Sequence, residues 1–192
     1  MTQEYVGELT TQSTKRNVFL TYHHADQAEV ATFIDSFEGA FSELRAIGVS
    51  DEDDFIDSND TDYVLRRIRE KYITGTSATI ALIGQCTWAR RYVDWEVAAT
   101  LRDNTNDPRG GLLAVQLASI DGRADVALPP KVAMNRDYDR GTDTERGYAS
   151  YHRYPSSGTA VAQWVEDAIW RRDNREPALG STSDLKKQNS SC

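Results

Sequence analysis

Short apolar runs alternate along this chain with longer segments in which apolar residues recur about every 3.6 positions. The short runs are typical of strands, and the longer segments are typical of amphipathic helices. Strands are expected at residues 18–22, within 44–49, at 78–83 and at 112–117. The run at 78–83 (ATIALI) is apolar on both faces, as a central parallel strand must be. The alternation predicts an α/β fold, a doubly wound parallel sheet with helices on both faces.

Helices are expected between these strands, and capping residues mark where two of them begin. Asp26 can cap the first helix, with Glu29 completing a capping box. Asp60 can cap the second, whose apolar stripe leaves a set of basic residues mostly outward. These basic residues are Arg66, Arg67, Arg69 and Lys71.

One domain is expected at residues 15–172, since the 192 residues of the chain fall within the usual size of a single domain. A last helix is predicted at about residues 160–172, whereas residues 118–157 give little regular signal. Residues 1–14 and 173–192 are polar, so they are predicted to be a flexible N-terminal segment and a disordered C-terminal tail.

Charge and composition exclude several classes of protein. The net charge of −8 and the pI near 4.9 disfavour binding to nucleic acid. The chain has no apolar run near the roughly 20 residues that cross a bilayer and no signal peptide, so we expect a cytoplasmic protein without membrane contact. The two cysteines, Cys86 and Cys192, lack the spacing of a disulfide scaffold or a zinc site, and Cys86 is expected to be a small packing residue.

Sequence motifs of several enzyme classes are missing. The chain contains no GxGxxG dinucleotide motif, no GxxxxGK[ST] phosphate loop, no GxSxG elbow and no HExxH helix. Ligands of an open parallel sheet bind where strands end. The loops expected at that edge are residues 22–24, 50–60, 84–87 and those after Leu117.

Glu96 stands out because it follows one of these loops among residues that repel water, including Tyr92 and Trp95. An unpaired carboxylate in such surroundings lowers stability, so its presence indicates a partner or a functional role. Two interpretations remain open from the pattern alone. Glu96 either performs chemistry or pairs with an arginine such as Arg102 or Arg66.

Three stretches together resemble a known family. They are VFLTYHHAD at residues 18–26, DSNDTDYVLRRIREKYI at 57–73 and TGTSATIALIGQCTWARRYVDWEV at 74–97. The chain is similar to bacterial TIR-like proteins, including the TIR protein of the Thoeris anti-phage defence system, over roughly residues 16–103. The resemblance implies a flavodoxin-like, TIR-like sheet. It also implies cleavage of NAD, as a substrate, at the nicotinamide glycosidic bond, with no metal expected.

The resemblance implies that Glu96 is the catalytic residue. It also suggests NAD contacts for a set of residues at the strand ends and on the helix of Glu96: Tyr22, His23, His24, Phe55, Ser58, Asn59, Tyr92 and Trp95. Each has a structural alternative. A strand-end tyrosine often packs, the histidines are ordinary loop residues, and Phe55 leads into a helix. The acidic stretch at 51–62 is more typical of a solvated loop than of a metal site.

Elementary chemistry is compatible with one catalytic carboxylate. Nicotinamide is cationic in NAD and leaves as a neutral base, so the reaction needs no general acid. In the Thoeris-like members the ADP-ribose product becomes a signal that activates a separate effector protein, and a phage-derived trigger and homo-oligomerisation are further expectations. The alternative is a non-catalytic TIR-type module that binds a partner protein and uses Glu96 in a salt bridge. A third interpretation is a flavin-binding relative of flavodoxin.

Overall fold

The computed structural model describes residues 15–46, 60–104, 107–139 and 144–192. Within them the main sheet has five parallel strands in the order β2-β1-β3-β4-β7. The strands are β1 (Asn17–Thr21), β2 (Glu43–Ala46), β3 (Ala78–Ile83), β4 (Gly111–Gln116) and β7 (Ser150–His152). This order is that of a flavodoxin-like fold, so the predicted α/β sheet is confirmed.

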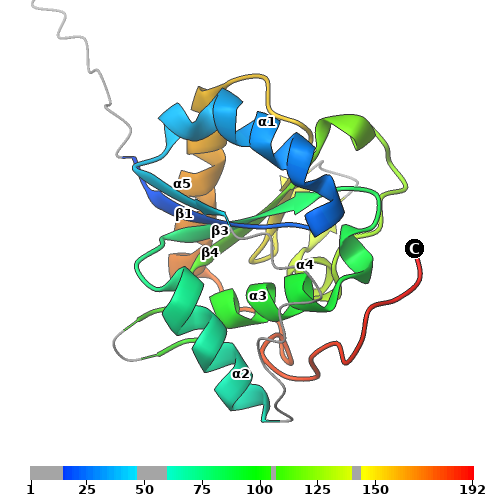
Figure 1. Ribbon diagram of the computed structural model, residues 1–192. Coiled ribbons are helices and arrows are strands. Elements are labelled where there is room, and N and C mark those ends of the chain that lie inside the picture. Colours follow the sequence, from blue (N-terminus) through cyan, green and yellow to red (C-terminus); the bar gives the residue numbers. More distant parts are fainter. Residues whose placement is uncertain (1–14, 47–59, 105–106, 140–143) are drawn as a thin grey trace, which may run out of the picture.

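Helices cover both faces of the sheet (Figure 1). One face carries α1 (Gln27–Phe37) and α5 (Gly158–Asn174), and the other carries α2 (Thr61–Ile68), α3 (Arg91–Leu101) and α4 (Pro130–Asn135). Successive side chains of a strand point to opposite faces. Val18 and Leu20 of β1 therefore pack with α1 and α5, while Phe19 packs with α2 and α3. Thr21, two residues after Phe19, faces α3 as well.

The region without regular signal, residues 118–157, contributes the fifth strand. It contains α4, β7 and a small antiparallel hairpin of β5 (Tyr138–Asp139) and β6 (Thr144–Glu145). These elements are too short for periodicity to reveal. They are held by tertiary packing instead, because Val132, Tyr148 and Ala149 are buried in one cluster with α3 and β4.

The end of the second helix differs from the prediction. Arg69 was expected to face outward, but it is only 4% exposed. After α2 the chain continues as a π-helical turn, η3 (Arg69–Ile73), in which the Thr74 N–H donates to the Arg69 carbonyl at 2.9 Å. The Arg69 guanidinium points inward, donating to the Ala99 carbonyl and the Asp107 carboxylate. Arg69 lies one helical turn after the buried Leu65, on the covered side of the helix, and partners on distant segments satisfy its guanidinium there.

One predicted cap is confirmed and the other is wrong. The Asp60 side chain accepts hydrogen bonds from the N–H groups of Asp62 and Tyr63 at the start of α2. Asp26 makes no such cap, because a 3-10 turn, η1 (His24–Asp26), leads into α1. Glu29 completes no capping box, and its carboxylate accepts from the Ser119 N–H instead.

The segment after α5 differs most from expectation. Residues 175–192, called here the C-terminal segment, lie beside α4 and α3 (Figure 1). Cys192 at its end forms a disulfide with Cys86. Sequence had suggested a disordered tail and an unpaired Cys86. The segment is held by hydrogen bonds and the disulfide, which polar composition does not reveal. Residues 1–14 lie outside the described residues.

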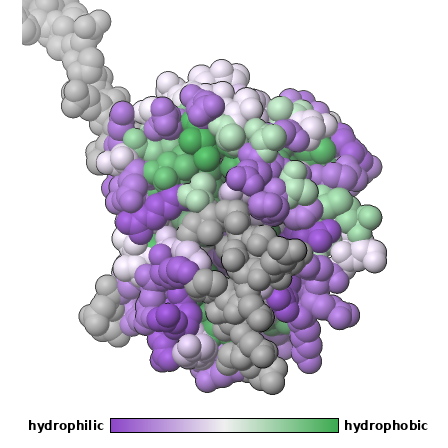
Figure 2. Space-filling model, viewed as in Figure 1, coloured by the Kyte–Doolittle hydropathy of each residue, from purple (hydrophilic) through white to green (hydrophobic). Residues whose placement is uncertain are grey.

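The surface fits the charged composition. Figure 2 shows one face that is mostly hydrophilic, with apolar side chains gathered toward the side where α1 lies. A shallow hollow between α1 and β2 is lined partly by Ile34, Phe41 and Leu44. Among the described residues, the structure has no helix long and apolar enough to cross a membrane.

Candidate active site

Glu96 is placed by the helix that carries it. Val93, Val97 and Leu101 of α3 recur at helical spacing and pack on β3 and β4, so this stripe fixes the rotation of the helix. Glu96 lies beside the stripe and faces the sheet, where only 3% of it is exposed. Its Oε2 accepts a hydrogen bond from the hydroxyl of Thr21, at the end of β1.

Burial dominates the electrostatics of Glu96. Loss of solvation raises the pKa of its carboxyl from 4.5 to about 8, and the hydrogen bond from Thr21 opposes this rise because it favours the ionised form. The ion-pair reading is wrong for both arginines considered. Arg102 pairs with Asp62 at 2.9 Å, and the guanidinium of Arg66 lies over the ring of Tyr63. Glu96 is thus a buried acid whose described side-chain partner is a hydroxyl.

The residues after β1 divide into packing and exposed groups. Tyr22 is 8% exposed and belongs to the core on the α1 and α5 face, so it packs as the structural alternative predicted. Burial, and to a lesser extent the charge of Glu96, raise the pKa of the Tyr22 phenol. His24 is exposed and His23 is half-buried. Burial raises the pKa of the Asp26 carboxyl, and the charge of the neighbouring His23 partly opposes this rise. The structure therefore places Tyr22 in the core and leaves His24 exposed.

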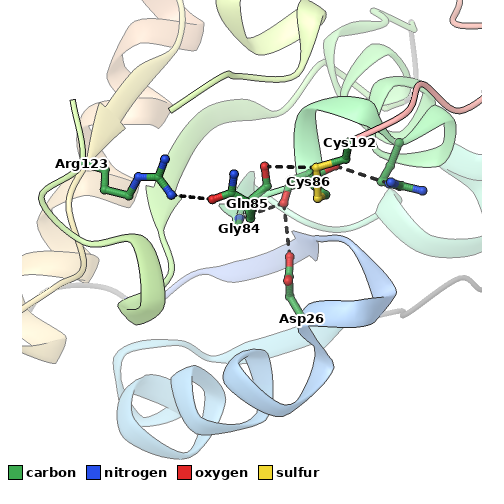
Figure 3. The surroundings of a disulfide bond; sticks show 8 residues. Asp26, Gly84, Gln85, Cys86, Arg123 and Cys192 are labelled. Atoms are coloured by element: carbon green, nitrogen blue, oxygen red, sulfur yellow. Dashed lines mark hydrogen bonds between the residues drawn. A yellow bond between two sulfur atoms is a disulfide. The ribbon is translucent and has the colours of Figure 1, made fainter. Parts of the chain in front are cut away.

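Three of the four predicted strand-end loops meet. The order β2-β1-β3 places the topological switch point, where ligands bind in such sheets, between β1 and β3. The Thr87 hydroxyl lies 3.4 Å from Asp26 Oδ2, and Arg123 donates to the Gln85 side chain at 2.5 Å (Figure 3). A Cβ on Gly84 would lie 2.2 Å from Asp26 Oδ2, so only glycine lets this carboxylate approach. The pattern alone did not single out Asp26 or Arg123 as members of this edge.

The aromatic residues of α3 form a separate cluster. Tyr92 and Trp95 make an edge contact with ring centroids 5.7 Å apart, and the Arg91 guanidinium lies over both rings. Trp95 packs with α2 and donates its indole N–H to the Lys186 carbonyl at 2.8 Å. Trp95 is therefore a core residue here, covered by the C-terminal segment. Phe55, Ser58 and Asn59 lie outside the described residues.

Thr21 is the partner that sequence reasoning missed. It lies 75 positions before Glu96 and is fully buried. The available signal was a polar residue directly after the apolar run at 18–20, on the face opposite Val18 and Leu20. Such a residue needs a hydrogen-bond partner when buried.

Comparison with known families agrees with this fold. A family model described as "Thoeris protein ThsB, TIR-like domain" matches residues 19–120, which is more than half of the chain. The match includes Thr21, Gly84 and Glu96. No curated protein matches the chain.

Proposed function

Since this chain belongs to the TIR-like domain family of the Thoeris protein ThsB, we propose that it is an enzyme that cleaves NAD at the nicotinamide glycosidic bond. Glu96 is the catalytic carboxylate in this proposal. The product is an ADP-ribose-derived nucleotide that activates a separate effector protein in anti-phage defence.

The observation that carries the proposal is a buried acid without a cationic partner among the described residues. An acid held in a low-dielectric site lowers stability, and such sites are common where a protein performs chemistry. Departure of nicotinamide leaves positive charge on the ribose, and a placed carboxylate stabilises that charge more strongly where water is excluded. Glu96 has these properties, with the Thr21 hydroxyl holding one oxygen.

The raised pKa fits a cationic substrate. With a pKa of about 8, the Glu96 carboxyl is largely protonated at neutral pH while the site is empty. The nicotinamide ring of NAD carries a positive charge, and a nearby opposite charge lowers the pKa of a carboxyl. Substrate binding therefore favours the ionised form that stabilises the transition state.

Access to Glu96 requires a change in its surroundings. At 3% exposure the carboxyl is covered, so contact with the ribose of a dinucleotide needs the groups above it to move. This requirement fits an enzyme that remains inactive until a trigger acts. Because the protein carries a net charge of −8, attraction of the phosphates must come from local donors such as Arg123 and backbone N–H groups.

The test is NAD consumption in phage-infected cells that produce the chain, so that any phage-derived trigger is present. We expect loss of NAD and release of nicotinamide with the natural chain, and a decrease of roughly 100-fold or more with Glu96→Gln. Glu38→Gln, at an exposed position, is the matched control and keeps full activity. Equal turnover by Glu96→Gln, with its folding shown by circular dichroism, refutes the catalytic role.

A non-catalytic interaction module is the alternative. It predicts intact NAD in infected cells for every variant. That reading relied on a salt bridge of Glu96, and the two arginines proposed for it are engaged elsewhere.

A further inference from the structure

The C-terminal segment is attached first to α4. The Lys131 ammonium donates to the carbonyls of Gly180 and Ser183. The Asn135 side chain accepts from the Ala178 N–H at 2.9 Å and donates to the Ser181 hydroxyl at 2.8 Å. Lys131, Asn135 and Ser181 are buried, so this first half of the segment is built into the domain.

The second half of the segment runs along the first turns of α3, the helix that carries Glu96. The Lys186 N–H donates to Asp94 Oδ2 at 3.0 Å, in addition to the bond that its carbonyl accepts from Trp95. The Asn189 side chain accepts from the Arg91 N–H at 2.8 Å, which satisfies a backbone donor at the start of the helix. The Ser190 N–H then donates to the Ala89 carbonyl at 2.9 Å.

The disulfide closes this arrangement at the strand ends. Cys86 follows Gln85 in the loop after β3, next to the contact between Asp26 and that loop (Figure 3). Cys192 is exposed and Cys86 is half-buried, so a reductant in solution can reach the bond. Accessible disulfides of this kind are the labile ones, and in reducing compartments they are commonly redox-sensing.

We propose that the disulfide of Cys86 and Cys192 is a site of thiol–disulfide exchange with a dithiol reductant, and that its reduction releases residues 186–192 from α3. One thiolate of the reductant attacks Sγ of Cys192, which forms a mixed disulfide and expels Cys86 as a thiolate that takes up a proton. The second thiol of the reductant then displaces Cys192. The protein disulfide gains two electrons and two protons, and the dithiol becomes a disulfide.

The composition of the segment explains why the covalent bond decides its position. Leu185 packs against the cluster of Trp95, but residues 186–192 (KKQNSSC) contain no large apolar side chain. Their hydrogen bonds with α3 exchange for bonds with water at small net gain. Reduction therefore frees the residues after Leu185 while Lys131 and Asn135 keep the first half in place. Release uncovers the start of α3 and the loop at 84–90.

Hydrogen exchange of the full-length chain, measured by mass spectrometry with and without dithiothreitol, tests this proposal. We expect reduction to accelerate exchange of the Lys186 and Ser190 amides at least about tenfold, because they lose their acceptors, Asp94 on α3 and Ala89 in the turn before it. The amides of Ala178 and Ser181 are the internal control and stay unchanged, since α4 and the segment itself hold them.

The variant Cys192→Ser separates the disulfide from other effects of the reductant. It exchanges rapidly at Lys186 and Ser190 in both conditions. Slow exchange at these amides after reduction, or in the variant, overturns the proposal. Alkylation of both cysteines in the unfolded chain without any reductant overturns it as well. None of these measurements uses NAD, so the result is independent of the proposed enzymatic activity.

Discussion

Replacement of Glu96 by glutamine is predicted to change how the stability of the protein depends on pH. The folded protein holds the Glu96 proton up to a pKa of about 8, whereas the unfolded chain releases it near 4.5. Glutamine cannot ionise, has nearly the same shape, and can still accept the hydrogen bond from Thr21. The variant therefore keeps the contacts of the protonated site and loses only its titration.

The size of the effect follows from the two pKa values. Below about pH 4.5 the carboxyl is protonated in both the folded and the unfolded protein. The contribution of its raised pKa to the free energy of unfolding is therefore fully present there. As the pH rises toward about 8, the free energy of unfolding falls by about 1.4 kcal/mol per pH unit. The total loss reaches about 5 kcal/mol and then levels off. Glu96→Gln should gain this amount relative to the natural chain at high pH.

Urea unfolding followed by tryptophan fluorescence, between about pH 5 and about pH 9, measures this difference. Subtracting one protein from the other removes the groups that both share. One is His152, whose pKa burial lowers to about 4 and whose contribution to stability rises with pH. Glu38→Gln should show no trend. A difference between Glu96→Gln and the natural chain that stays constant over this range would refute the buried, protonated state of Glu96.

Three further predictions follow from single contacts. Thr21→Val removes the hydrogen-bond donor that favours the ionised Glu96 carboxylate, so the pKa of Glu96 should rise further. The pH range over which the free energy of unfolding falls, measured by comparison with the double variant Thr21→Val and Glu96→Gln, should therefore move upward. Thr21→Ser keeps the hydroxyl and should leave this range in place. Gly111→Ala forces a Cβ to within 2.7 Å of the Ala168 backbone in α5, which cannot move aside as a side chain can, and should lower the free energy of unfolding by about 1–3 kcal/mol. Gly39→Ala, with nothing within 4 Å, is its control, and equal stability of the two variants would contradict the close approach. Cys192→Ser opens a bond between residues 106 positions apart and should reduce stability by about 2–5 kcal/mol without reductant. With dithiothreitol the variant and the natural chain should unfold at the same urea concentration, and a difference that persists there would argue against the disulfide as its cause.

The strongest predictions from sequence concerned elements that bury a long apolar face. The apolar run at 78–83 became β3 with the same bounds, and the helix expected after the first strand became α1, which buries Val30, Phe33 and Phe37. Periodicity reports such faces directly, because burial selects apolar residues at the spacing of the element. Periodicity did not reveal strand β7 and helix α4, because their three and six residues are too few to form a pattern.

The candidate site was predictable in part. Glu96 was found because its neighbours are apolar and because the surrounding motif resembles a known family. Its environment was not predictable. Whether a carboxylate on such a helix meets an arginine or a hydroxyl depends on how α3 packs on the sheet, and the structure places Thr21 there while Arg102 binds Asp62.

The sequence by itself determined the alternation of strands and helices, the family, and the burial of one glutamate on a helix. Each of these depends on residues that are near one another in the chain, so local patterns record them. Only the tertiary structure decided which groups meet across long separations. The pairing of Thr21 with Glu96, the inward turn of Arg69 and the bond from Cys86 to Cys192 each depend on packing of distant segments, which no local pattern encodes.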